Sequence, residues 1–247
     1  MADHSSIEWT EATWNPTTGC DRTSPGCDHC YAMTLAKRLK AMGQPKYQSD
    51  GDPRTSGPGF GLTLHQEAVD LPLRWREGRT VFVNSMSDLF HEQVPLDFIT
   101  EVFATMSATP QHTFQVLTKR SRRLAGVSGS LLWPTNVWMG VSIESDRYTF
   151  RADHLRATGA AVKFLSVEPM LGPVPSLDLT GLDWVIAGGE SGPGARPVDP
   201  AWVRALRDRC VRRGVKFFFK QWGGRTPKAG GRELDGEVWD EMPGVAV

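Results

Sequence analysis

The chain has 247 residues, of which 40% are hydrophobic, so it can bury a substantial core and is not an intrinsically disordered protein. Its 28 basic and 28 acidic residues give a net charge of zero. This balance argues against a strongly electrostatic binder of nucleic acid, although it does not exclude a local basic groove. We expect residues 1–247 to form a single domain.

The N-terminal sequence MADHSSIEWTEATWN has no basic start followed by an apolar run, and no stretch of the chain approaches 18 uninterrupted apolar residues. We therefore expect no signal peptide and no membrane partner, and a soluble, cytoplasmic protein. In that reducing compartment, clustered cysteines indicate a metal site or catalysis more than a disulfide bond.

The first elements predicted along the chain flank a cluster of cysteines. Residues 7–15, IEWTEATWN, are predicted to form a weak first strand, and residues 30–42 have apolar side chains at helical spacing. The cysteines between them have the spacing C-x6-C-x2-C: Cys20, Cys27 and Cys30. Residues 44–78 are rich in Gly, Pro and Ser, and we expect them to form a long loop, or a lid, after the first helix.

Short apolar runs then recur along the chain and alternate with stretches of helical character. Runs that are apolar nearly throughout are typical of parallel strands buried on both faces. The expected strands are 80–84, 113–118, 136–142, 162–167, 183–189 and 215–219, and the expected helices are 96–108, 145–159 and 199–214. About seven βα units result, which predicts an α/β fold, a partial or full TIM-like barrel with parallel strands. An open, doubly wound sheet is the alternative.

The clustered cysteines need a chemical explanation, because a fourth cysteine is missing from their loop. A loop that follows the first strand of a parallel βα fold lies at the carboxyl ends of the strands, where active sites form. A structural zinc ion normally has four ligands, so His29, His91 or Cys210 would have to complete one. A [4Fe–4S] cluster on three cysteines instead leaves one iron open. We expect Cys210, in the helix 199–214, to pack in the core.

Three cysteines in this position resemble those of the radical S-adenosylmethionine superfamily. The usual spacing there is C-x3-C-x2-C with an aromatic residue before the last cysteine, whereas this chain has a first gap of six residues and His29 in the aromatic position. The resemblance implies an enzyme in which Cys20, Cys27 and Cys30 hold a [4Fe–4S] cluster. It also implies that the open iron binds S-adenosylmethionine, whose reductive cleavage gives a 5′-deoxyadenosyl radical that abstracts hydrogen from a substrate.

The chain also resembles a narrower, uncharacterised family of three-cysteine proteins that are often assigned to phages. This likeness covers most of the chain. The phrases that carry it are IEWTEATWNPTTGC (7–20), SMSDLFHE (85–92), SVEPMLGP (166–173), VIAGGESGPGARP (185–197) and FFFKQWGG (217–224).

Polar residues that follow the runs 80–84 and 113–118, which are the second and third strands when 7–15 is counted as the first, are candidate cofactor ligands. The superfamily carries a GGE-type motif after the second strand, which binds the methionine amino group. This chain has no GGE there, but Ser85, Ser87 and Asp88 supply acceptors, unless they serve as a turn and helix cap. After the third run, Lys119 supplies a cation for the methionine carboxylate or a substrate phosphate, or else begins a solvated helix.

Carboxylates follow the next three apolar runs. Glu144, with Ser142 close by, resembles the ribose ligand that the superfamily places after its fourth strand. Glu168 and Glu190 are candidate catalytic residues, which could bind a substrate or take a proton. After the last run, Trp222 could stack on a base or close the end of the barrel.

The expected partners follow from the same features. The basic segment 119–123 and the phage-like resemblance favour a DNA, RNA or nucleotide substrate, and the reductive chemistry implies an electron-donor protein. Two other functions stay open. One is a zinc-stabilised nucleic-acid-binding protein without turnover, and the other is an iron–sulfur enzyme that does not use S-adenosylmethionine.

Overall fold

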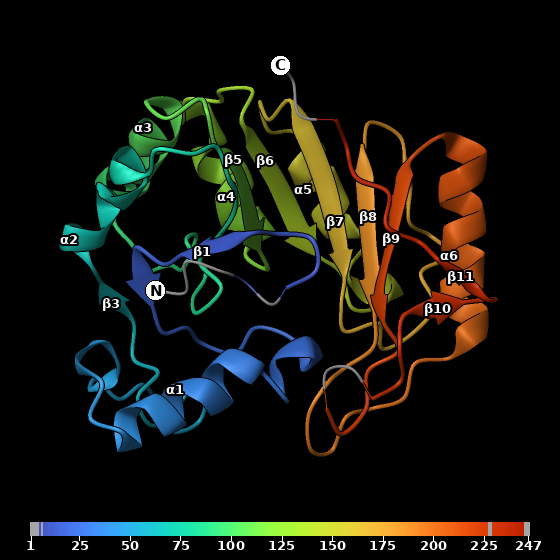
Figure 1. The fold of residues 1–247 in the computed structure, drawn as a ribbon, viewed down its shortest axis with the longest axis horizontal. Coiled ribbons are helices and arrows are strands. Elements are labelled where there is room, and N and C mark those ends of the chain that lie inside the picture. Colours follow the sequence, from blue (N-terminus) through green and yellow to red (C-terminus); the bar gives the residue numbers. More distant parts are fainter. Residues whose placement is uncertain (1–4, 6, 227–228, 245–247) are drawn as a thin grey trace.

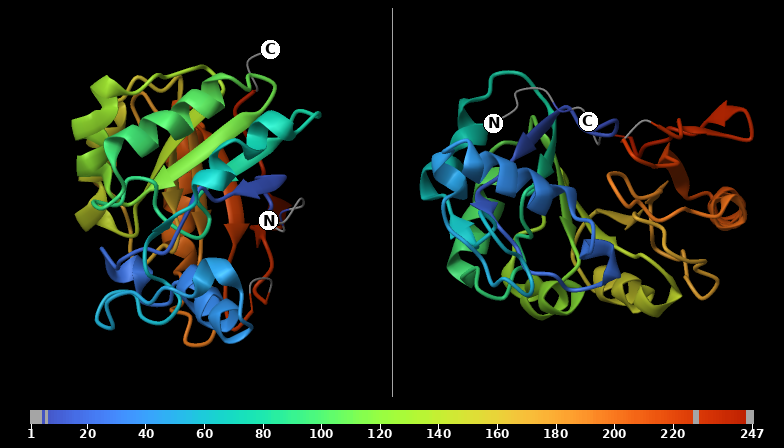
Figure 2. Two further views of the ribbon diagram at one scale, coloured as in Figure 1. Left: turned by 90° about the vertical axis from the view of Figure 1, so that its left-hand side faces the viewer. Right: turned by 90° about the horizontal axis from the view of Figure 1, so that it is seen from below.

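The computed structural model describes residues 5, 7–226 and 229–244 (Figure 1). Within these residues, seven parallel strands form one sheet in the order β1-β4-β5-β6-β7-β8-β9. The strands are β1 (Ala12–Trp14), β4 (Thr80–Val83), β5 (Thr113–Thr118), β6 (Val137–Ser142), β7 (Val162–Val167), β8 (Trp184–Gly188) and β9 (Lys216–Gln221). The sheet curls without closing, so β1 and β9 are its two edges (Figure 2).

This half-barrel confirms the predicted TIM-like α/β fold. The doubly wound alternative is wrong, because the strand order runs in one direction across the sheet and never reverses. The first strand is shorter than expected, since only Ala12–Trp14 of residues 7–15 pair with β4.

Helices cover the outer face of the sheet and the carboxyl ends of its strands. They are α1 (Tyr31–Ala41), α2 (Gln66–Val69), α3 (Leu96–Ser107), α4 (Ser121–Val127), α5 (Phe150–Arg156) and α6 (Pro200–Arg213). Both ends of α6 are capped: the Asp199 carboxylate accepts from the amide of Ala201, and Gly214 has a φ of 67°. The expected helix 145–159 is broken into a 3-10 turn at Asp146–Tyr148 and α5. Among the described residues, no helix is long and apolar enough to span a membrane.

The two faces of the sheet bury different side chains, because successive residues of a strand point to opposite faces. Aliphatic residues such as Leu165 face the helices and join the main core. The concave face carries a mostly aromatic cluster, in which Ile186 joins Trp9, Phe82, Trp138, Phe164, Trp184 and Phe218. Ser142 and Lys220 continue the alternation of Trp138 and Phe218 toward the carboxyl ends, so the concave face becomes polar there.

The excursion 44–78 packs beside α1 at the carboxyl ends of the strands. It contains short 3-10 turns, α2 and the strand β3 (Thr63–Leu64), which pairs antiparallel with β2 (Thr17–Thr18). Its Phe60 is buried with Ala32 and Ala36 of α1, and Cys20 and Cys30 pack against this cluster. The helix α1 and the cysteine-bearing residues 20–30 are therefore held at the carboxyl ends of the strands (Figure 1).

The C-terminal segment covers one edge of the sheet. After the hairpin β10 (Glu233–Leu234) and β11 (Glu237–Val238), the amide of Phe219 donates to the carbonyl of Trp239 over 2.8 Å. Phe218 and Asp240 form an antiparallel bridge. This contact satisfies backbone groups that an uncovered edge strand would expose.

Candidate functional site

Three cysteine side chains line one cavity of about 160 Å³ at the carboxyl ends of β4, β5 and β6. Cys20 follows β2, Cys27 ends the 3-10 turn Pro25–Cys27, and Cys30 is the N-cap residue of α1. All four cysteines of the chain lie in the described residues and are free thiols. Cys210 is separate from the other three, because it is buried in the main core with other residues of α6.

Five predicted cofactor-binding residues line the same cavity: Ser85, Ser87, Asp88, Lys119 and Ser142. The Ser87 hydroxyl donates to the carbonyl of Gly19 over 2.7 Å, and the Ser85 hydroxyl is hydrogen-bonded to the side chain of Asn15. The Lys119 Nζ lies 3.7 Å from the Glu144 carboxylate. The parallel sheet therefore brings together residues that lie far apart in the sequence.

The Asp88 carboxylate is engaged in a network that ends at a cysteine. It accepts from the Thr118 hydroxyl over 2.7 Å and pairs with the Arg120 guanidinium over 3.3 Å. Arg120 also donates to Glu92 over 2.9 Å and to the Cys20 Sγ over 3.2 Å. Asp88 thus holds a buried cation against Cys20, and it is not an unoccupied acceptor for a ligand.

The three thiols have different electrostatic environments. Burial raises the pKa of Cys20 to about 12, although the Arg120 cation opposes this shift. Burial likewise raises the pKa of Cys30. Burial is also the largest influence on Cys27, but the Lys119 cation and hydrogen bonds from the preceding backbone outweigh it together and lower the pKa of that thiol. Cys27 is therefore the cysteine with the greatest thiolate character.

Glu144 lies against the cysteine loop, which we define as residues 20–30. Its carboxylate accepts from the Ser24 hydroxyl over 2.6 Å and from the Arg151 guanidinium over 2.9 Å. The Glu144 side chain is 1% exposed. A Cβ atom on Gly26 would stand 2.5 Å from the Glu144 Cγ, so only glycine permits this approach. Glu144 is not among the residues that line the cavity, so its contacts support the cysteine loop and do not form the cavity wall.

Glu190 contacts the same loop from the end of β8. Its carboxylate is hydrogen-bonded to the His29 Nδ1 over 2.8 Å and accepts from the Arg196 guanidinium at both oxygens. The Arg196 guanidinium also donates a hydrogen bond to the carbonyl of Pro25 over 2.8 Å. Burial raises the pKa of Glu190, but the hydrogen bonds from Arg196 and His29 prevail and lower it to about 2. Glu190 is not among the residues that line the cysteine cavity.

Glu168 has a different partner from the other two carboxylates. It pairs with the Lys220 ammonium over 2.7 Å, and both side chains are 19% exposed. Trp222, two residues further along, donates its indole N–H to the carbonyl of Glu233 over 2.8 Å and packs on Phe219. Trp222 is therefore occupied by the C-terminal segment, while the Glu168–Lys220 pair stays accessible to solvent.

The basic segment 119–123 divides between internal and exposed cations. Arg120 is buried, and Arg123 donates to the carbonyls of His91 and Val94. Lys119 lines the cavity, and Arg122 is exposed. Only part of this segment can therefore meet an anionic partner.

The histidines expected to complete a zinc site have other partners. His29 is hydrogen-bonded to Glu190, and the His91 Nε2 lies 2.9 Å from the Asp21 carboxylate. In the part of the chain that the structure describes, no three side chains of His, Cys, Asp or Glu converge closely enough to hold one ion. A four-iron cluster is wider than one ion, so its thiolates stand further apart.

Sequence reasoning did not find the residues that support the cysteine loop. Ser24 and Gly26 lie against Glu144, and Arg196 binds Glu190. Gly26 lies inside the C-x6-C segment, and Arg196 lies in the GESGPGARP segment, so both were within motifs already noted. The sequence spacing does not pair Ser24 or Gly26 with Glu144, which lies more than a hundred residues away, nor Arg196 with Glu190 across a loop.

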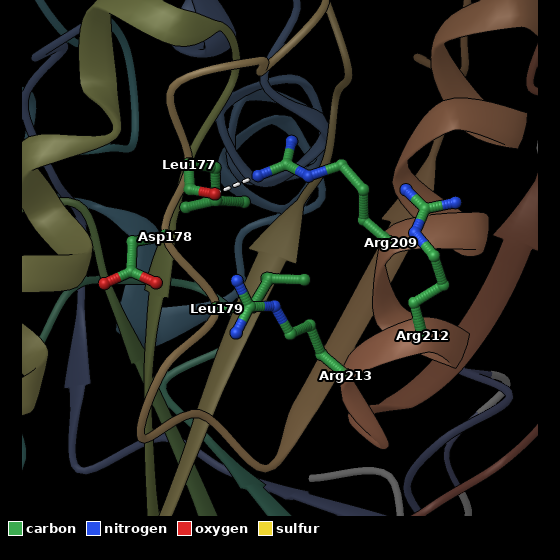
Figure 3. Close-up of a pocket in the computed structure, with 6 residues that line it drawn as sticks. All are labelled: Leu177, Asp178, Leu179, Arg209, Arg212 and Arg213. Atoms are coloured by element: carbon green, nitrogen blue, oxygen red, sulfur yellow. Dashed lines mark hydrogen bonds between the residues drawn. The ribbon is translucent and has the colours of Figure 1, made fainter.

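A larger hollow, of about 280 Å³, lies away from the cysteines beside the C-terminal half of α6. Figure 3 shows its lining: Leu177, Asp178, Leu179, Arg209, Arg212 and Arg213. Arg209 donates to the carbonyls of Val174 and Leu177, so it fastens the 174–182 loop to α6. Cations in the last turn of a helix also stabilise its negative end, so this hollow has a structural explanation.

The model of the family described as "Protein of unknown function (DUF5131)" matches residues 4–243. The chain belongs to this family. The prediction of an uncharacterised family is thereby confirmed, while a phage origin stays a prediction. No curated protein matches the chain.

Three solved structures of spore photoproduct lyase are similar to the DUF5131 chain. A cysteine-to-serine variant has 15% identity and a TM-score of 0.49 over 85% of this chain and 63% of that one. A tyrosine-to-phenylalanine variant has 12% identity and a TM-score of 0.45 over 70% and 54%. The lyase complexed with dinucleoside spore photoproduct has 13% identity and a TM-score of 0.42 over 79% and 59%. The chain thus spans less than two thirds of the length of each.

Proposed function

We propose that this protein is a radical S-adenosylmethionine enzyme with a [4Fe–4S] cluster on Cys20, Cys27 and Cys30. The observation that carries the proposal is the shared cavity of these three free thiols at the carboxyl ends of a half-barrel. No fourth cysteine lines that cavity among the described residues. Three thiolates leave one iron of the cluster open, in the way that catalytic metal sites keep a position for their ligand.

The donor set and its surroundings fit such a cluster. Thiolates are the preferred ligands of iron–sulfur centres, and the cations of Lys119 and Arg120 lie where they offset thiolate charge. The thiols must lose their protons when metal binds, and this is easiest at Cys27. When bound, the cluster and S-adenosylmethionine supply the one-electron reductive cleavage that yields a 5′-deoxyadenosyl radical.

The remaining cavity residues receive roles from their positions. We assign the amino group of the cofactor to the hydroxyls of Ser85 and Ser87, its carboxylate to Lys119, and a ribose hydroxyl to Ser142. These groups would orient the cofactor by hydrogen bonds and charge. The excursion 44–78 contacts the loop where the Cys20 amide donates to the carbonyl of Phe60 over 3.3 Å, and we propose that it excludes water there.

The three strand-end carboxylates divide into two classes. Glu144 and Glu190 face the cysteine loop, so we propose that they shape the site and do not transfer protons. Glu168, which pairs with Lys220, is the carboxylate that we propose for taking a proton or binding a substrate group. In this proposal Glu190 is not catalytic and Glu144 does not bind the ribose, unlike the roles that we expect from the sequence.

We keep a DNA, RNA or nucleotide substrate as the proposed substrate class. Lys119 at the cavity and the exposed Arg122 are the cations of the basic segment that are placed to meet phosphates. An electrophoretic mobility series with single-stranded and duplex DNA and RNA, from low to physiological salt, tests this class. Retention that weakens as salt rises supports it, and no retention at any salt removes it.

The cofactor proposal is tested on protein purified without oxygen and reconstituted with iron and sulfide. We expect about four irons per chain, a broad visible absorbance, and formation of 5′-deoxyadenosine after chemical reduction with S-adenosylmethionine. The triple variant Cys20→Ala, Cys27→Ala, Cys30→Ala should lose all three. The matched control is Cys210→Ala, which removes a thiol of the main core and should keep the metal.

The other functions give different results in the same experiment. About one zinc per chain and no colour identifies the zinc-stabilised binding protein. A cluster that forms without any cleavage of S-adenosylmethionine identifies the iron–sulfur enzyme of another class. Either result overturns the radical proposal.

A further inference from the structure

The cysteine loop has little hydrophobic packing of its own. Of residues 21–30, all of which the structure describes, only Ser24 is fully buried, while Cys27 and Cys30 are partly buried. Three backbone hydrogen bonds stay within the loop: the amides of Cys27, Asp28 and Cys30 donate to carbonyls three residues earlier. A polar loop of this kind keeps one conformation only if side chains from elsewhere hold it.

Glu190 and Arg196 are two of these outside side chains, and they are first of all bound to each other. The Glu190 Oε2 accepts from the Arg196 amide and Nε, each over 2.9 Å, and its Oε1 accepts from the Arg196 Nη2 over 2.5 Å. The Glu190 side chain is 4% exposed. Bidentate, charge-assisted hydrogen bonds to a shielded carboxylate are strong and fix geometry as well as distance.

In the part of the chain that the structure describes, the other side-chain hydrogen bonds and ion pairs of Glu190 and Arg196 end on the cysteine loop. Arg196 donates to the carbonyl of Pro25 over 2.8 Å and lies 3.5 Å from the Asp28 carboxylate. Glu190 reaches His29, next to Cys30. Pro25 and Asp28 lie two residues before and one residue after Cys27. The pair therefore holds the chain on both sides of that cysteine.

We infer that Glu190 and Arg196 are a positioning pair, which holds Cys27 and Cys30 in their ligand arrangement before any cluster is present. The effect on the cluster rests on the proposed function, while the effect on the loop does not. Glu144 holds the loop at Ser24, ahead of Cys27, so it cannot replace this pair at residues 27–29. Site groups held in place by supporting hydrogen bonds lose little freedom when the ligand binds.

The first test uses the full-length protein without metal. Hydrogen exchange is measured on the backbone amides of residues 22–30 in the wild type, Glu190→Gln, Arg196→Met and Arg196→Lys. We expect exchange to rise about tenfold or more in the first two variants, because each tenfold corresponds to the loss of one charge-assisted bond. Arg196→Lys should give an intermediate exchange rate, since an ammonium keeps the positive charge but cannot form the two parallel hydrogen bonds of a guanidinium. Arg204→Met, which removes an exposed partner of Asp235, is the matched control and should not change.

The second test uses the same variants after reconstitution with iron and sulfide. We expect a changed electron paramagnetic resonance spectrum and a shifted midpoint potential of the cluster in Glu190→Gln and Arg196→Met, with partial recovery in Arg196→Lys. A general loss of stability would lower the amount of cluster but would leave the spectrum of what remains unchanged.

The outcomes separate this inference from the proposed function. If the wild type takes up no iron, the proposed function fails, and hydrogen exchange still decides whether the pair orders the loop. Unchanged exchange in both Glu190→Gln and Arg196→Met overturns the inference. Faster exchange with an unchanged cluster spectrum and potential also overturns it, because the pair would then order the loop without positioning the ligands.

Discussion

The Arg120 guanidinium donates a hydrogen bond to the Cys20 sulfur over 3.2 Å while its side chain is 4% exposed. Asp88, which is 8% exposed, faces the same guanidinium over 3.3 Å. The carboxylate and the thiol both raise the pKa of Arg120 above its usual range against the opposing effect of burial. A cation is therefore built into the wall of the site, where it contacts a proposed ligand of the cluster.

Replacing Arg120 by methionine should destabilise the protein by about 3–5 kcal/mol, because the change leaves the buried Asp88 carboxylate without its cation. Urea unfolding of the metal-free protein at pH 7 measures this change. Arg204→Met, at an exposed ion pair, should cost less than about 1 kcal/mol. Equal losses in the two variants would show that Asp88 does not depend on Arg120.

Replacing Gly26 by alanine should disturb the cysteine loop, because the new Cβ would stand 2.5 Å from the Glu144 Cγ. Overpacking of this kind costs about 1–3 kcal/mol, and we expect the reconstituted variant to lose iron to a chelator faster than the wild type. Gly126→Ala in α4 is the matched control, since a Cβ there meets no atom within 4 Å. Equal iron loss in the two variants would contradict the close packing of the loop on Glu144.

The ion pair of Glu144 and Arg151 should show strong coupling in a double-mutant cycle. Both side chains are buried, at 1% and 4% exposure, and lie 2.9 Å apart. Unfolding free energies of Glu144→Gln, Arg151→Met and the double variant should give an interaction energy of about 0.5–3 kcal/mol. The same cycle on the exposed pair Asp153 and Arg156 should give less than about 0.5 kcal/mol. A cycle that closes to zero at Glu144 would mean that Ser24 and Lys119 hold the carboxylate without Arg151.

Much of the fold was predictable because it depends on local patterns. Apolar runs buried on both faces mark β5 to β9, and the caps Asp199 and Gly214 mark the ends of α6. The curl of the sheet and its open edge depend on how strands pack and on the C-terminal segment at β9, which no run of residues encodes locally. The short helix α4 was expected only as the alternative in which Lys119 begins a solvated helix, because its sequence SRRLAGV lacks a long apolar face.

The site was predictable only in part, for a related reason. Chain order places residues at strand ends, so the clustering of Cys20, Lys119 and Ser142 follows from a parallel sheet. Whether a strand-end carboxylate faces a ligand or a loop depends on partners distant in sequence. Glu144 and Glu190 lie two residues past β6 and β8 and both turn to the cysteine loop, whereas Glu168 lies one residue past β7 and pairs with Lys220.

Glu190 should make the stability of the metal-free protein depend on pH in acid. Its pKa is lowered from 4.5 to about 2 in the folded state, with Arg196 and His29 facing it. A group whose pKa is lowered by folding contributes stability above its unfolded pKa, and this contribution is lost as pH falls through the folded value. The difference in unfolding free energy between the wild type and Glu190→Gln should therefore be constant from pH 7 to about 5 and shrink between about 4.5 and 2. Urea unfolding of both proteins at several pH values measures it, and a difference that does not vary with pH would mean that Glu190 is not held by these contacts.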